Sequence, residues 1–307
     1  MLIWKLPLKF GYISGMNSPK ALVVGQFLIS DSDPAFIVAE LGINHNGDIS
    51  IAKELILAAA SAGANAVKFQ KRTPELCVPI DQRLKERETP WGLMTYMDYR
   101  YRMEFDRSQY LELMNFAREL KLEFFATPWD EESLKFLIDI GVPCIKIASA
   151  SLTDLNLISE SAECGLPVII STGMSTMENI VSAVKILEKN QLIIAHSTST
   201  YPCPVEELNL SMITVLKKEF NCLVGYSGHE SGVSTTVAAV VLGAKYIERH
   251  LTLDRAMWGT DHAASLEPQG FTRLVRDIRI FEQAIGNGIK QIYSSEIPYL
   301  EKLRRIK

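Results

Sequence analysis

Cysteine is sparse in this sequence of 307 residues, and the five cysteines present are dispersed along it. No two of them have a C-x-x-C spacing. The sequence therefore offers neither a disulfide framework nor a cysteine-based zinc site. We expect five reduced thiols in a cytoplasmic protein.

Basic clusters are also scarce. The formal net charge is -4, and the only basic cluster is EKLRRIK at residues 301–307. Proteins that bind nucleic acids use many Lys and Arg contacts to phosphates, which this sequence does not supply. We exclude nucleic acid as a partner and interpret the terminal cluster as a solvated helix face.

No long apolar run is present either. The N-terminal stretch 1–15 is partly apolar, but Lys5, Pro7 and Lys9 interrupt it. A membrane helix needs about 20 apolar residues, and a signal peptide needs an uninterrupted apolar region. We predict neither, and interpret residues 1–21 as an N-terminal extension.

Eight short β-branched runs are what the sequence does contain. Most are apolar on both faces, as buried parallel strands are, and helical patterns lie between them. Eight such units predict a (β/α)8 TIM barrel over residues 22–290. A doubly wound sheet is the alternative, but the first run is followed by INHNGD and no Gly-rich phosphate loop. The runs span residues 36–42, 66–70, 123–128, 144–149, 167–172, 192–199, 223–228 and 246–252.

Three segments lie outside the repeating units. Residues 22–33 have the pattern of a β-hairpin, which we expect to cap the floor of the barrel. Residues 71–107 are too many for a plain loop and predict a lid or an interface element. Residues 291–307 form a C-terminal linker or tail.

Polar and ionisable residues gather at the predicted C-terminal ends of the strands, where TIM barrels place their active sites. Lys68 and Lys146 lie in predicted buried strands, and a buried lysine needs an anionic partner. Glu40 and Glu248 can supply part of that negative charge. Lysines with several hydroxyl groups predict a pocket for a small phosphorylated acid, and a purely structural network is the alternative. These residues are Glu40, His45, Lys68, Gln70, Thr127, Lys146, Ser149, Ser171, Thr172, His196, Thr198, Ser199, Ser227, His229, Glu248, His250, Asp261 and His262.

His229 and His250 end neighbouring predicted strands, so their rings can converge. Two imidazoles suit Mn, Fe, Co or Zn, and leave positions open for water and substrate. Glu248 or Asp261 either completes the metal site or acts as a base. For His262, a hydrogen bond that holds its loop and a catalytic role are equally open.

Nine sequence motifs follow one another along the chain: FIVAELGINHNGD, AVKFQK, FFATPWD, KIASA, PVIISTGMST, HSTSTYPCP, VGYSGHE, IERHLTLD and GTDHAASLEP. These motifs and their order resemble the sialic acid synthase family, which comprises N-acetylneuraminate synthases and related nonulosonate synthases. The resemblance covers about residues 22–300. It implies condensation of phosphoenolpyruvate with an N-acyl hexosamine, such as N-acetylmannosamine or its 6-phosphate, to a nine-carbon 2-keto acid. It also implies a divalent metal, Mn²⁺ or Mg²⁺, and a homodimer.

The resemblance also implies roles for single residues. His229 and His250 would bind the metal, and Glu40, Glu248 and Asp261 are the expected catalytic carboxylates. Gln70 and Tyr201 would face the sugar, while Ser199 stands where many bacterial members have Asn. The residues expected to hold phosphoenolpyruvate are Lys68, Thr127, Lys146, Ser149, Ser171 and Ser227.

Members of the family usually continue into a small antifreeze-like domain that lends an arginine to the partner's sugar site. This chain ends at Lys307, where the linker to that domain would begin, so the sequence predicts its absence.

Three other functions stay open. A legionaminate- or pseudaminate-type synthase would take a different acyl sugar. A Schiff-base aldolase would use Lys146 as nucleophile without a metal. A degenerate barrel would have no catalytic role.

Overall fold

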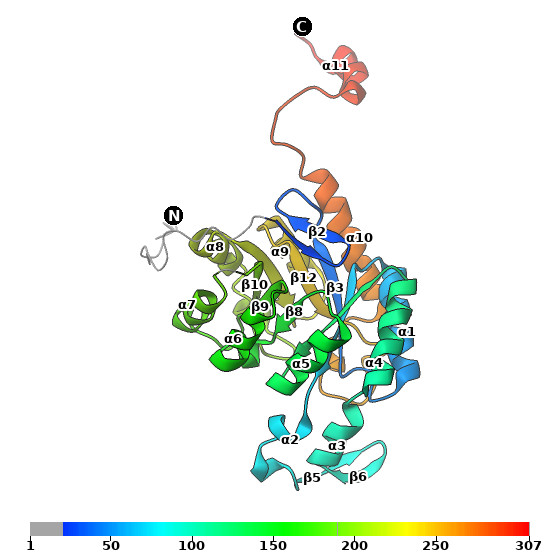
Figure 1. Ribbon diagram of the computed structural model, residues 1–307. Coiled ribbons are helices and arrows are strands. Elements are labelled where there is room, and N and C mark those ends of the chain that lie inside the picture. The colour runs from blue at the N-terminus through cyan, green and yellow to red at the C-terminus, as the bar shows by residue number, and fades with distance from the viewer. Residues whose placement is uncertain (1–20, 189, 307) are drawn as a thin grey trace.

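Eight parallel strands form a barrel in the computed structural model, which describes residues 21–188 and 190–306 (Figure 1). Hydrogen-bonded neighbours follow the order β7-β4-β3-β12-β11-β10-β9-β8, and contacts between β7 and β8 close the barrel. This arrangement confirms the predicted TIM barrel and all eight predicted strands. The strands are β3 (Phe36–Gly42), β4 (Ala66–Lys71), β7 (Glu123–Pro128), β8 (Ile145–Ile147), β9 (Val168–Ser171), β10 (Leu192–Ser197), β11 (Leu223–Gly228) and β12 (Tyr246–His250).

Helices between the strands cover the outside of the barrel (Figure 1). Asp48, Asp130 and Thr176 begin three of them by accepting hydrogen bonds from free backbone N–H groups. Gly63 and Gly141 end two of them in the left-handed conformation, which glycine adopts without steric cost. The helices are α1 (Ile49–Ala62), α4 (Arg107–Glu119), α5 (Glu131–Ile140), α6 (Leu155–Glu163), α7 (Met177–Ile186), α8 (Ser211–Phe220), α9 (Ser234–Val241) and α10 (Pro268–Ala284).

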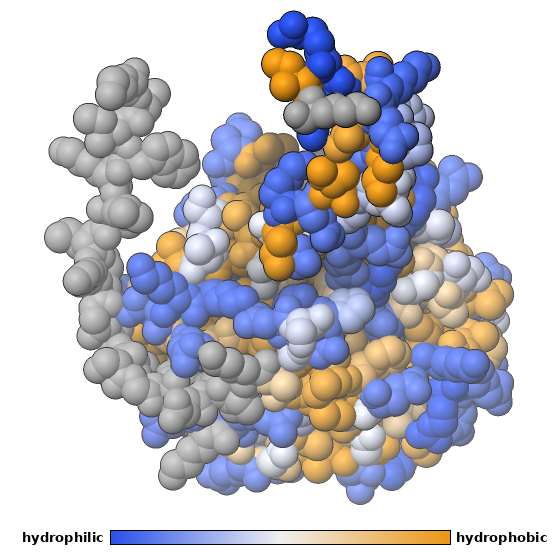
Figure 2. Space-filling model, turned by 90° about the horizontal axis from the view of Figure 1, so that it is seen from above, coloured by the Kyte–Doolittle hydropathy of each residue, from blue (hydrophilic) through white to orange (hydrophobic). Residues whose placement is uncertain are grey.

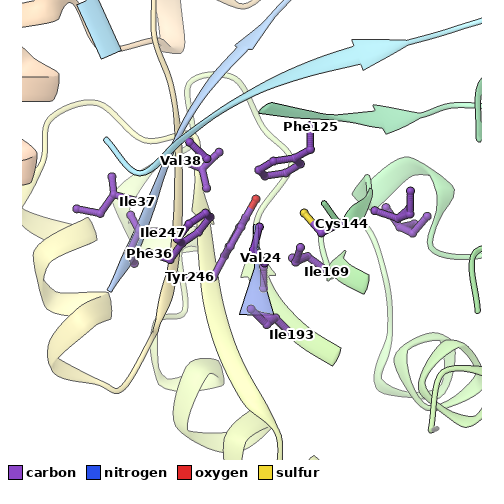
Figure 3. Packing of buried hydrophobic residues seen from close by; sticks show 14 of the residues in the cluster. Val24, Phe36, Ile37, Val38, Phe125, Cys144, Ile169, Ile193, Tyr246 and Ile247 are labelled. Atoms are coloured by element: carbon purple, nitrogen blue, oxygen red, sulfur yellow. The ribbon is translucent and has the colours of Figure 1, made fainter. Parts of the chain in front are cut away.

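The predicted hairpin is formed by β1 (Ala21–Val24) and β2 (Phe27–Ser30), and it covers the N-terminal end of the barrel. The ring of Phe27 packs 5.4 Å from that of Phe36, the first residue of β3. Val24 is fully buried and belongs to the same apolar cluster as Ile193 and Tyr246 inside the barrel (Figure 3). The barrel is therefore filled with side chains at this end, and a site must lie at the other.

Residues 71–107 form a folded unit at the opposite end (Figure 1). Tyr99 and Met103 of this unit pack with Ile43 from the loop after β3. A Cβ atom on Gly47 would lie 2.0 Å from the Arg102 carbonyl oxygen, so only glycine permits this close approach. The unit is thus docked on the C-terminal end of the barrel. It contains α2 (Pro74–Cys77), a 3-10 turn (Ile80–Gln82), β5 (Glu86–Thr89), β6 (Gly92–Thr95) and α3 (Tyr96–Met103).

The tail beyond α10 carries a 3-10 turn (Ser294–Glu296) and α11 (Ile297–Leu303) and extends away from the barrel at the hairpin end (Figure 1). Seen from that end, it mixes hydrophobic and hydrophilic residues (Figure 2). The predicted N-terminal extension, apart from Ala21, lies outside the described residues. None of the helices described is long and apolar enough to cross a membrane. All five cysteines are free of disulfides.

Candidate active site

A cavity of about 220 Å³ opens at the C-terminal ends of the barrel strands. Every residue predicted to bind substrate or metal lines this cavity, and so do two of the three predicted catalytic carboxylates. The lining residues are Glu40, Lys68, Gln70, Thr127, Trp129, Lys146, Ala148, Ser149, Ala150, Ser171, Met174, Ser199, Tyr201, Ser227, His229, Glu248 and His250. A larger hollow of about 590 Å³ lies elsewhere, along α10 and the loop before α9, and contains none of these residues.

Lys68 and Glu40 form a buried ion pair from adjacent strands. Glu40 of β3 is the register partner of Lys68 on β4, and Lys68 Nζ lies 2.6 Å from Glu40 Oε2. Lys68 Nζ also donates to the Thr127 hydroxyl over 3.1 Å. Gln70 Nε2 donates to the other oxygen of Glu40 over 2.9 Å. The Glu40 carboxylate is therefore held by two side chains of β4, one of which, Lys68, is itself bonded to β7.

Lys146 approaches the same centre from β8. Its Nζ donates to the Ser171 hydroxyl over 2.7 Å and lies 3.8 Å from Glu248 Oε2. Glu248 Oε1 lies 3.7 Å from Lys68 Nζ, so this carboxylate stands between the two lysines. Ser227 and Tyr246 each donate a hydroxyl hydrogen bond to Glu248.

Burial and pairing set the protonation of these groups. Burial raises the pKa of Glu40 to about 7, and Lys68 offsets this effect only in part. Burial would also raise the pKa of Glu248, but the two lysines and the Tyr246 hydroxyl outweigh it and lower that pKa to about 2. Burial lowers the pKa of Lys146 to about 8. Of the two carboxylates, Glu40 is the one that exchanges a proton near neutral pH.

His229 and His250 converge as predicted, with ring centroids 5.5 Å apart. His229 Nδ1 contacts the Thr198 carbonyl oxygen at 2.7 Å, which fixes Nδ1 as the protonated nitrogen and leaves Nε2 with a free lone pair. His250 Nδ1 is buried and finds no hydrogen-bond partner among the described residues. Burial lowers the pKa of both rings, so both are neutral, as metal ligands must be.

These two rings fit a divalent metal as a partial ligand set. Across residues 21–188 and 190–306, no group of three or more His, Cys, Asp or Glu side chains is placed to hold a metal by itself. A carboxylate also approaches the pair: Asp261 Oδ2 lies 3.7 Å from His250 Nδ1. Asp261 is not among the residues that line the cavity, and its catalytic role stays a prediction.

The other three histidines do not line the cavity. His45 stacks on Phe105, with centroids 4.4 Å apart, and its Nδ1 accepts a hydrogen bond from the Gly47 backbone. His196 Nε2 contacts the Leu208 carbonyl oxygen at 2.7 Å. His262 Nδ1 contacts the Thr252 hydroxyl at 2.7 Å, which is the loop-holding hydrogen bond considered as its structural alternative.

Sequence reasoning missed several parts of the cavity. Trp129 and Met174 contribute to its wall, and the signal for Trp129 was its place two residues after Thr127 on the same side. Gly173 lies so close to Ser149 and Ser199 that a Cβ atom there would meet the Ser199 hydroxyl at 2.2 Å. The backbone N–H of Gly173 donates to the Ser149 hydroxyl.

Comparison with known proteins gives one consistent result. A family model described as the NeuB family matches residues 55–290. N-acetylneuraminate-9-phosphate synthase of Mus musculus is 40% identical over 283 residues, which cover 90% of this chain and 78% of the relative. N,N'-diacetyllegionaminic acid synthase of Campylobacter jejuni is 38% identical over 280 residues, which cover 88% and 83%.

Solved structures agree with the sequence relatives. N-acetylneuraminic acid synthetase from Leptospira borgpetersenii, in complex with citrate, superposes with a TM-score of 0.81 at 34% identity. The match covers 93% of this chain and 98% of that one. A truncated 3-deoxy-D-arabino-heptulosonate 7-phosphate synthase from Thermotoga maritima matches with a TM-score of 0.67 at 14% identity, a likeness of fold alone.

Proposed function

The chain belongs to the NeuB family, and from this premise we propose that it condenses phosphoenolpyruvate with an N-acyl hexosamine. The product is a nine-carbon 2-keto sugar acid of the sialic acid type, and phosphate leaves by C–O cleavage. The observation that carries the proposal is the placement of Lys68 and Lys146 on either side of Glu248, beside Glu40, in one cavity.

Phosphoenolpyruvate brings a carboxylate and a phosphate, and the cavity supplies two ammonium groups with a ring of hydroxyls. Lys68 and Lys146 each already donate to one hydroxyl, on Thr127 and Ser171. The buried Ser199 hydroxyl has no hydrogen-bond partner within the described part of the chain, so it is free to donate to a ligand oxygen. Ser149 accepts from the Gly173 backbone and keeps its own hydroxyl hydrogen, so it is a second donor, whereas Ser227 gives its hydrogen to Glu248 and offers a ligand only its oxygen.

The proposed reaction makes and breaks bonds in the following order. C3 of phosphoenolpyruvate forms a bond to the aldehyde carbon of the open-chain sugar, and the aldehyde oxygen takes a proton and becomes a hydroxyl. C2 is left electron-poor, and water adds to it while giving a proton to a base. The C2–O bond to phosphate then breaks, phosphate leaves with the electron pair, and the remaining C2 hydroxyl loses its proton to give the ketone.

Glu40 is the best base for the water. Its pKa of about 7 lets it take a proton near neutral pH, whereas Glu248 stays ionised and holds the two lysines in place. Glu248 also balances positive charge that develops at C2. Lys68, 2.6 Å from Glu40, stabilises the ionised form of the base before it acts.

The sugar is proposed to lie toward Gln70, Tyr201 and the His pair, with Asp261 3.7 Å from His250. When bound, a divalent metal, Mn²⁺ or Mg²⁺, held by His229 and His250 would polarise the aldehyde carbonyl as a Lewis acid. The ring of Tyr201 lies 4.1 Å from that of His229 and 5.9 Å from that of His250, so it bounds the sugar space beside both ligands.

The test is phosphate release from phosphoenolpyruvate in the presence of a panel of acyl sugars. The panel includes N-acetylmannosamine, its 6-phosphate, and legionaminate and pseudaminate precursors. We expect release that depends on one of these sugars and is lost in Lys146→Met. Lys135→Met, which removes an exposed lysine paired with Glu132, serves as the matched control. No sugar-dependent release from any member of the panel would overturn the proposal.

A Schiff-base aldolase is the second candidate, and one observation favours it. The pKa of Lys146 is lowered to about 8 by burial, which makes a neutral amine nucleophile accessible. Borohydride added in the presence of pyruvate would trap such an enzyme as a stable adduct on Lys146. The synthase should not be trapped, and removal of divalent metal should abolish its activity.

A further inference from the structure

A second apolar cluster lies at the C-terminal end of the barrel, separate from the core that fills the barrel. It contains Tyr99 of the folded unit 71–107 and Ile43 of the loop after β3. Trp258 packs against it from a third segment, the loop 251–267 between β12 and α10. The cluster therefore joins three segments that are distant in the sequence.

Trp258 packs against two rings of the folded unit. Its ring lies edge to face with that of Trp91, with centroids 5.6 Å apart, and with that of Tyr99, with centroids 5.4 Å apart. Arg87 Cζ lies 4.6 Å from the centre of the Tyr99 ring and 5.9 Å from that of Trp258. Edge-to-face pairs and a nearby cation stabilise such a group beyond the burial of apolar area. We call Trp91, Tyr99 and Trp258 the aromatic clasp.

Hydrogen bonds do not tie the tip of the loop 251–267 to other segments. Within the part of the chain that the structure describes, the hydrogen bonds of residues 253–264 end on other residues of the same loop. The two ends of the loop are joined, because Leu251 and Leu266 form an isolated bridge. Trp258 is the residue through which the tip of the loop contacts the folded unit.

The same tip carries Asp261, three residues after Trp258. Asp261 Oδ2 lies 3.7 Å from His250 Nδ1, which finds no hydrogen-bond partner among the described residues. Burial raises the pKa of Tyr99, and the charge of Asp261 adds to this increase. Burial also raises the pKa of Tyr201 in the cavity wall, and the charge of Asp261 adds to that increase as well. Asp261 therefore lies near the aromatic clasp and near the cavity at the same time.

We propose that Trp258 is a positioning residue for the sugar half of the reaction. The aromatic clasp holds the loop 251–267 so that Asp261 stays beside His250. This inference rests on the proposed function, in which the acyl sugar lies at the His pair.

The phosphoenolpyruvate half of the site should not depend on the aromatic clasp. Lys68 and Lys146, the cations proposed to hold phosphoenolpyruvate, stand on β4 and β8 and not on the loop. Loss of the Trp258 ring should therefore impair the use of the sugar and leave the binding of phosphoenolpyruvate intact.

The experiment measures the two ligands separately in Trp258→Leu. At saturating phosphoenolpyruvate, kcat/KM for the acyl sugar that supports phosphate release should fall roughly 10- to 100-fold, as loss of one charge-assisted contact implies. The Kd for phosphoenolpyruvate, measured by calorimetry, should stay unchanged. Trp258→Phe keeps an aromatic ring and should restore most of the sugar-dependent rate.

Phe116→Leu is the matched control. Phe116 is a partly buried ring on α4 that packs on the barrel core, with Lys53 Nζ 5.6 Å from its centre, so its loss removes aromatic packing away from the loop. Both measurements should match the wild-type chain in this variant. An unchanged kcat/KM in Trp258→Leu, or an equal loss of affinity for phosphoenolpyruvate, would overturn the inference while leaving the synthase activity established.

A double-mutant cycle tests whether Trp258 acts through Asp261. If it does, Trp258→Leu should cost no further activity in a chain that already carries Asp261→Ala. Effects that multiply in the double variant would show that Trp258 acts independently of Asp261, and the positioning role would be wrong.

Hydrogen–deuterium exchange tests the aromatic clasp without turnover. Backbone amides of residues 253–264 should exchange faster in Trp258→Leu than in Phe116→Leu, while the barrel strands exchange alike in the two variants. That result supports the clasp even if no sugar of the panel releases phosphate, so a failure of the proposed function is recognised separately. Equal exchange of residues 253–264 in both variants refutes the clasp.

Discussion

The carboxylate of Glu40 lies 2.6 Å from the ammonium group of Lys68, and both side chains are closed off from solvent inside the barrel. A buried ion pair of this kind adds little net stability, because removing two charges from water costs about as much as their attraction returns. The pair is therefore better explained by chemistry: it keeps an acid with a pKa of about 7 next to a cation at the centre of the site.

The first prediction concerns pH. If Glu40 is the base, it must be ionised to act, so the rate of phosphate release should fall as pH drops through about 7. The hydrogen bond from Gln70 lowers the pKa of Glu40, so Gln70→Met should move the acid limb of the pH–rate profile to higher pH. Lys53→Met, at an exposed ion pair outside the cavity, is the control. An acid limb that stays in place in Gln70→Met would argue against Glu40.

The second prediction concerns metal. Replacing both His229 and His250 with Ala should abolish binding of Mn²⁺, measured as metal content after dialysis, and abolish turnover as well. His196→Gln is the matched control, because His196 lies at the end of a neighbouring strand but contacts the Leu208 carbonyl instead. If the double variant still bound a stoichiometric amount of metal, His229 and His250 would not be the metal ligands.

The barrel and most of its site were predictable because both depend on simple periodicities. Eight buried runs specify eight strands, and active-site residues at the ends of barrel strands come from the same end of the fold. It was harder to predict which of the five histidines line the cavity. Ser197 pairs in register with Ser227, which lines the cavity, so the alternation of side chains turns His196 to the outer face. The register between strands decides which face of the sheet a histidine points to, and the sequence alone does not give that register.

The interior of residues 71–107 could not be predicted from its sequence. Its strands β5 and β6 are short and carry no buried residue, so they lack an apolar alternation. The unit is held by contacts distant in sequence, such as Trp91 against Trp258 with ring centroids 5.6 Å apart. The approach of Asp261 to His250, at 3.7 Å, likewise depends on the folded loop after β12 and could not be read from the sequence.

The third prediction concerns stability. Arg249 is fully buried, and its guanidinium group is paired with Glu230 over 3.1 Å behind β11 and β12. Arg249→Met leaves that buried carboxylate with hydroxyl donors from Tyr226, Thr235 and Thr236 but without a counter-charge, which should lower the free energy of unfolding by about 3–5 kcal/mol in urea titrations. The double variant Arg249→Met/Glu230→Gln should recover part of the loss. A single variant as stable as wild type would show that water reaches Glu230.

The fourth prediction concerns the source of oxygen and tests the order of bond breaking. In the proposed reaction, water adds to C2 and phosphate leaves with its bridging oxygen. A reaction run in H₂¹⁸O should therefore place the label in the keto acid and none in the released phosphate. If the P–O bond broke instead, water would attack phosphorus and the label would appear in phosphate.

Phosphate is the better observable, because the product ketone exchanges its oxygen with water while phosphate does not under mild conditions. Mass spectrometry of the phosphate, sampled early in the reaction and compared with unlabelled phosphate incubated alongside, measures this directly. Labelled phosphate would require a base aimed at phosphorus, a role that Glu40 beside Lys68 and Gln70 is not proposed to have.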